Sequence, residues 1–137
     1  MAVVKELIRE EADGSISFGN YELAQKTKKS DVLVHGDSYK VKTFGEVTRL
    51  EKNDLLVYES EPGTAVSHFT EDENGVSFTV EGPEDAQIIL GLADDASYRV
   101  TVGGEDQGIL ETGMGGKLVL SVEMGSTDSV QITVRRD

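Results

Sequence analysis

Two histidines are the side chains of this 137-residue chain best suited to transfer protons near neutral pH. His35 precedes Gly36-Asp37 in a predicted turn, and His68 alternates with Val66 and Phe69 in a predicted strand. A hydrolase also needs a nucleophile or activated water, and a group that stabilises the developing charge. No serine has a G-x-S-x-G setting, and no H-x-x-x-H zinc spacing is present. We interpret both histidines as surface or hydrogen-bonded structural residues.

Carboxylates are the other candidates for chemistry, because the chain has 26 acidic residues. A pair held about 5 to 9 Å apart could hydrolyse a glycosidic bond, and carboxylates in turns could bind Ca²⁺. Acidic residues are also common in turns because they hydrogen-bond the local backbone, so we predict no catalytic residue and no cofactor, with Ca²⁺ as an open alternative. The turn carboxylates are Glu71, Asp72 and Glu73 beside Asn74, then Glu84, Asp85, Asp94 and Asp95; the calcium candidates are the 71–74 and 94–95 groups.

Exposed aromatic side chains are the usual platforms for carbohydrate, but the chain has no Trp, four Tyr and four Phe. Tyr21 and Phe44 lie near predicted connections and are the best candidates for contact with a ligand. The other positions that we considered fall in predicted strands, where packing in the core is the expected use: Tyr39, Tyr58, Phe69, Phe78 and Tyr98.

The net charge of −13 argues against binding to nucleic acid or to anionic membranes, because both require a cationic surface. Residues 62–137 carry 14 of the 26 acidic residues and only 4 of the 13 basic ones. The basic cluster Lys26, Lys28 and Lys29 has no interleaved aromatic residues, and we expect it to be a solvated or edge-protecting segment. The chain has no cysteine, which excludes disulfides and thiolate chemistry.

The N-terminal residues do not form a signal peptide, because charges interrupt the short apolar run. We therefore expect a cytoplasmic protein, or an extracellular one if this chain is a trimmed form. Val3, Val4, Leu7 and Ile8 fit a helix and a strand about equally well.

Strands must position these residues, because apolar and polar side chains alternate along most of the chain. The clearest stretch is residues 96–123, where Gly103-Gly104 and Gly115-Gly116 supply the positive φ of tight hairpin turns. Turn residues also predict hairpins around 35–37, 52–54 and 71–75. Pro62-Gly63 suits the centre of a type II turn.

About a dozen short strands at this spacing predict an all-β fold. The alternatives are one antiparallel β-sandwich or two small fused sheet units. A seam near Pro62 or Gly82 divides the chain into a hairpin unit, residues 1–81, and an Ig-like or meander unit, residues 82–137, which could also form one continuous domain.

Two resemblances extend this interpretation. Residues 98–104, YRVTVGG, followed by Gly108, Thr112, the GKL at 116–118 and Leu120, resemble the Y-x-V-x-V-(D/N)-G pattern of Ig-like accessory modules in bacterial polysaccharide-active proteins. That resemblance implies a fold rather than a function.

The segments 5–32, 36–53 and 57–66 resemble small bacterial proteins labelled endosialidase-like. The label implies cleavage of sialic-acid polymers, but the chain is too short for a sialidase propeller. We assign no catalytic residue from this resemblance, because the arginines that could bind a carboxylate are scattered along the sequence: Arg9, Arg49, Arg99, Arg135 and Arg136.

These observations predict a non-enzymatic structural or interaction module that self-associates, because a chain with many strand edges can cover them in this way. The expected partner is a second copy or another protein. The alternative is a module that binds glycans or processes sialic-acid polymers, and a third possibility is calcium-dependent adhesion.

Overall fold

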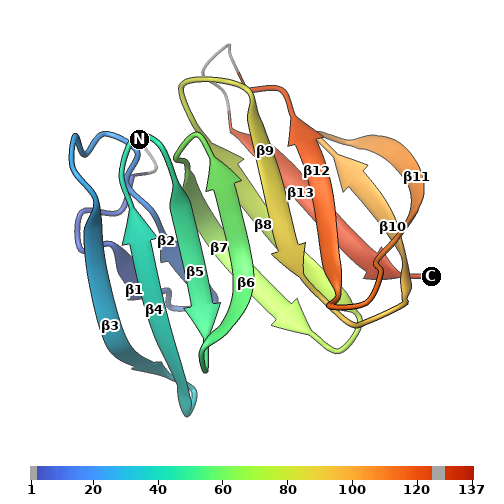
Figure 1. The fold of residues 1–137 in the computed structure, drawn as a ribbon, viewed down its shortest axis with the longest axis horizontal. Helices are drawn as coiled ribbons and strands as arrows, with labels where there is room; N and C mark the ends of the chain where they lie inside the picture. Colours follow the sequence, from blue (N-terminus) through green and yellow to red (C-terminus); the bar gives the residue numbers. More distant parts are fainter. Residues whose placement is uncertain (1–2, 125–128) are drawn as a thin grey trace.

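The structure, a computed structural model, describes residues 3–124 and 129–137. Its regular secondary structure consists of strands in two antiparallel sheets, one of seven strands and one of six, packed face to face (Figure 1). The prediction of an all-β sandwich is confirmed. In the residues described, no helix is long and apolar enough to cross a membrane.

The seven-stranded sheet has the order β1-β2-β7-β8-β13-β10-β11. Its two edges are β1, which has three residues, and β11, which is mostly exposed. Its strands are β1 (Ile8–Glu10), β2 (Ile16–Phe18), β7 (Ala65–Asp72), β8 (Gly75–Glu81), β10 (Ser97–Val102), β11 (Glu105–Glu111) and β13 (Val130–Arg136).

The six-stranded sheet has the order β12-β9-β6-β5-β4-β3 and lies in front in Figure 1. Its edges are β12 and β3. Its strands are β3 (Thr27–Val34), β4 (Asp37–Thr43), β5 (Thr48–Lys52), β6 (Leu55–Glu61), β9 (Ala86–Gly91) and β12 (Lys117–Val122).

One hydrophobic core fills the space between the sheets. Its centre is a group of edge-to-face aromatic contacts, with the Tyr58 ring 5.3 Å from Phe18 and 5.6 Å from Phe78 between centroids. Phe18 is also buried. The aromatic residues that were predicted to pack in the core are all buried: Tyr39, Tyr58, Phe69, Phe78 and Tyr98.

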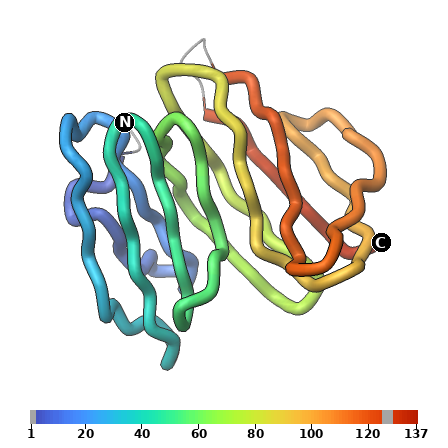
Figure 2. Tube along the Cα trace, in the orientation of Figure 1, coloured from blue at the N-terminus to red at the C-terminus, as the bar shows by residue number. Residues whose placement is uncertain are grey.

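The proposed boundary between residues 81 and 82 lies between β8 and β9. Strand pairing crosses it in both sheets, because β6 pairs with β9 and β8 pairs with β13. After β8 the chain changes sheet at every connection except β10–β11, as the trace in Figure 2 shows. The two segments therefore share one core, and their division into two units stays a prediction.

Two turn predictions were wrong. Gly63 does not have the positive φ that the third residue of a type II turn requires, so this segment is not a type II turn. Glycine is required there because a Cβ atom would lie 2.0 Å from the Phe44 carbonyl oxygen. Gly115 and Gly116 do have positive φ, but they connect β11 to β12 in the opposite sheet rather than closing a hairpin.

Other local predictions were confirmed. Hairpins form at 35–36, 53–54, 73–74 and 103–104. The N-terminal segment fitted a helix and a strand about equally well. In the structure it forms a strand only at β1, and Leu7 just before this strand takes a positive φ of 76°.

A buried network of hydroxyl groups fixes the crossover from β6 to β7. The Thr64 hydroxyl lies 2.8 Å from both the Tyr58 and Ser60 hydroxyl oxygens. The Thr48 hydroxyl donates to the Thr64 carbonyl oxygen at 2.9 Å, accepts from the Thr64 backbone N–H, and lies 2.8 Å from the Thr43 hydroxyl. Burial raises the pKa of the Tyr58 phenol, which keeps this group protonated.

Replacing Thr64 with Val tests this network, because valine has a similar shape but leaves two buried hydroxyl groups without their partner. We expect T64V to lower the free energy of unfolding by about 2 to 3 kcal/mol in denaturant titrations. T133V is the matched control on the half-buried face of β13, with an expected change of about 0.5 kcal/mol or less. Equal stability of the two variants would contradict this role of Thr64.

Candidate functional site

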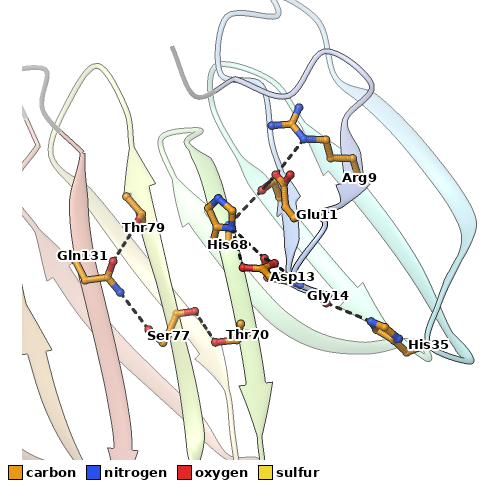
Figure 3. A network of polar contacts seen from close by, with 12 residues as sticks. Arg9, Glu11, Asp13, Gly14, His35, His68, Thr70, Ser77, Thr79 and Gln131 are labelled. Carbon is orange, nitrogen blue, oxygen red and sulfur yellow. Dashed lines mark hydrogen bonds and ion pairs between the residues drawn. The ribbon is translucent and has the colours of Figure 1, made fainter.

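The two histidines lie on opposite sides of the turn that connects β1 to β2 (Figure 3). His68 occupies a bulge of β7, where the pairing with β8 shifts between Ser67 and Thr70 and His68 takes a φ of 54°. The extra residue lets Val66 and Phe69 both face the core. The prediction that His68 alternates with Val66 and Phe69 was therefore wrong. The three-residue spacing between Val66 and Phe69 was the feature of the sequence that could have indicated the bulge.

A serine and a carboxylate lie beside His68, a combination that sequence spacing does not indicate. The Ser15 hydroxyl is 3.1 Å from Nδ1 of His68 and 2.5 Å from Oδ1 of Asp13. Oδ2 of Asp13 is 3.4 Å from the same Nδ1 atom. In a catalytic triad the serine and the carboxylate contact different ring nitrogens. Here they share one nitrogen and the serine donates to the carboxylate, so this geometry does not activate a nucleophile.

Burial agrees with this conclusion, since Ser15 is only 2% exposed. The neighbouring Ser17 hydroxyl donates to Glu11 and accepts the backbone N–H of His68 at 3.2 Å. The cluster thus holds the β1–β2 hairpin against β7 and satisfies the polar groups at the bulge.

His35 anchors the same turn from the six-stranded sheet. Its Nε2 atom lies 3.2 Å from the Gly14 carbonyl oxygen and 3.2 Å from Oε2 of Glu10. The side chain is 62% exposed, and these two contacts link the two sheets rather than orient a base toward a substrate.

Two carboxylates of the acidic turn at 71–75 take part in local interactions. Asp72 pairs with Arg135 at 3.1 Å and accepts the Asn74 N–H at 2.7 Å, while Glu71 accepts from Lys52 at 3.0 Å. Among the residues described, no three His, Cys, Asp or Glu side chains are close enough together to hold a metal ion. Binding of Ca²⁺ by the 71–74 or 94–95 group stays a prediction.

Tyr21 and Phe44, the predicted ligand contacts, are both half-buried. The Tyr21 hydroxyl donates to Oε2 of Glu81 at 3.1 Å, and burial followed by this hydrogen bond raises its pKa to about 12. The backbone of Gly45 donates to the Leu23 carbonyl oxygen, which holds the two segments together. Contact of either aromatic side chain with a ligand stays a prediction.

A groove of about 480 Å³ lies between the six-stranded sheet and Glu71 of β7. Its walls combine exposed or half-buried leucines with the Lys52–Glu71 ion pair, which connects β5 to β7. Among the described residues that line it there is no aromatic side chain and so no stacking platform, and its carboxylates are Glu71, paired with Lys52, and Asp94. Its lining includes Leu55, Leu56, Leu92, Asp94 and Lys117.

The edge strands differ in how far they are open to further pairing. β3 has a bulge in which Asp31 takes a φ of 59°, and β11 contains Gly108 at a φ of 85° beside a shift in register. β12 differs from both, because its six residues pair with β9 in one continuous register and Val119 is 52% exposed. In the part of the chain that is described, the other side of β12 has no strand partner.

No family model, no curated protein and no solved structure matches this chain.

Hydrogen bonds to carboxylates at the β1–β2 turn predict a pH dependence. The Ser15 hydroxyl and backbone N–H lower the pKa of Asp13, and the Ser17 hydroxyl lowers that of Glu11. A lowered native pKa stabilises the fold above the unfolded-state pKa, and this contribution is lost as the pH falls through the native value. Wild type should therefore be more stable than D13N at about pH 7, and the difference should shrink as the pH falls below the ordinary aspartate pKa of about 3.9.

The measurement is the thermal midpoint of both proteins across this pH range. E84Q is the control, because Glu84 is exposed and outside this cluster. A difference between wild type and D13N that stays constant down to the lowest pH would contradict the assignment.

Proposed function

We propose that this protein is a non-enzymatic interaction module that self-associates through the edge strand β12. The single observation that carries the proposal is that one side of β12 has no strand partner in the described part of the chain, while its other side pairs with β9 in an unbroken six-residue register without a bulge. An exposed, regular edge presents backbone donors and acceptors to an incoming strand.

Side-chain charge supports a second copy of the chain as the occupant. Lys117 is exposed at the start of β12 and Glu123 is exposed just after its end, and neither has an ion-pair partner among the described residues. Antiparallel pairing of two copies centred on Leu120 sets Lys117 opposite Glu123 of the other copy, twice because the arrangement is two-fold symmetric. Opposite charges at such positions stabilise strand pairing.

Apolar residues fit the same register. Leu118 lies opposite Val122 of the other copy, and both side chains are buried toward the core in each chain. On the outer face, the exposed Val119 of one copy lies diagonally across from Val119 of the other, within the reach of cross-strand contacts. The pairing would join two six-stranded sheets into one continuous sheet and remove one exposed edge from each chain.

Charge exchange tests this register. Sedimentation equilibrium of wild type should give twice the 14.8 kDa chain mass. E123K and K117E each bring two pairs of like charges into contact and should weaken the dimer about tenfold or more. The double variant K117E/E123K restores opposite charges and should restore the dimer.

E105K is the matched control, because it makes the same charge change on the edge strand β11 and should leave the dimer intact. A monomeric wild type at high micromolar concentration would contradict the proposal. Equal weakening by E105K and E123K would contradict the assigned register.

A further inference from the structure

Four cationic side chains gather on the outer face of the six-stranded sheet, although the chain has a net charge of −13. They surround a depression of about 100 Å³ at β3, β4 and β5, with Glu51 as the one carboxylate in its lining. The cations are Lys28, Lys40, Lys42 and Arg49.

Strand register creates this cluster. Lys28 lies directly opposite Lys42 in the β3–β4 pair, and Lys42 lies directly opposite Arg49 in the β4–β5 pair. The three side chains form a row across neighbouring strands that are about 4.8 Å apart. Like charges at directly opposed positions destabilise a sheet, so this row needs a reason other than stability.

The two lysines of the row are not neutralised by the protein. Neither Lys28 nor Lys42 has an ion-pair partner among the residues that the structure describes, whereas Lys40 lies 3.5 Å from Glu51. Protection of an edge against aggregation accounts for lysines on β3. It does not account for Lys42 and Arg49, because β4 and β5 are interior strands of the sheet.

Arg49 is held in a fixed orientation between two carboxylates. Its Nε donates to Glu51 at 2.8 Å and its Nη1 donates to Glu59. These contacts leave Nη2 without a protein partner in the described part of the chain. Hydrogen bonds from Arg49 lower the pKa of Glu51, so this carboxylate stays charged and keeps the guanidinium in position. A guanidinium fixed in this way is a pre-organised donor for an oxyanion.

We propose that this depression binds an oxyanion group, a carboxylate, sulfate or phosphate, between Lys28, Lys42 and Arg49. The group can be a free anion or part of an acidic saccharide, since both present the same charged oxygens. The site is formed within one chain, and β3 and β12 are at opposite edges of the sheet. Oxyanion binding is therefore independent of self-association.

Calorimetric titrations with inorganic sulfate, inorganic phosphate and a carboxylated oligosaccharide, each at constant ionic strength, test the proposal. The wild type should bind at least one of these probes. Binding of sulfate or phosphate alone identifies a free anion as sufficient, and binding of the oligosaccharide alone identifies the saccharide as the source. K28Q/K42Q should weaken binding about tenfold or more.

A second readout separates a binding site from a structural one. K28Q/K42Q relieves the repulsion between opposed lysines, so its melting temperature without added anion should equal or exceed that of wild type. The matched control K5Q/R136Q removes two exposed charges elsewhere and should change the affinity less than twofold. Absence of binding by wild type to all three probes would overturn the proposal, as would equal weakening by the control.

Discussion

The buried hydroxyl network around Thr64 is the interaction on which the arrangement of the two sheets most depends. It lies where the chain leaves the six-stranded sheet after β6 and enters the seven-stranded sheet as β7. Apolar packing between the sheets is not directional, whereas hydrogen bonds among Thr48, Ser60 and Thr64 accept only one relative position of β5, β6 and the crossover. Tyr58 connects this network to the aromatic centre of the core. The core thereby fixes which faces and edges remain outside.

The candidate functional features of this sandwich all lie on its surface. The serine, histidine and aspartate that meet at the β1–β2 turn are arranged to support a hairpin, since Ser15 is covered and both partners approach Nδ1 of His68. The groove between the sheets has leucine walls and the Lys52–Glu71 ion pair, with no aromatic side chain among the described residues that line it. The regular edge of β12 and the cationic row on β3 to β5 are different, because each has polar or charged groups with no partner among the residues that the structure describes.

Sequence patterns predicted what depends on neighbours along the chain. Alternation identified most of the strands, and residues such as Asn53 with its φ of 52° identified hairpin turns. Sequence patterns did not predict which strands pair with one another. Gly115 and Gly116, for example, were predicted to close a hairpin, but they lead into the other sheet. The cluster of Lys28, Lys42 and Arg49 was missed for the same reason, because residues 21 positions apart become neighbours only through two strand pairings.

Hydrogen exchange of the β12 backbone measures most directly whether this protein acts through an open strand edge. The amide groups of residues 117–122 that point away from β9 should exchange rapidly in dilute solution and become protected as protein concentration rises, while amides on β11 keep the same rates. Rapid exchange of the outward β12 amides at every concentration would contradict the account.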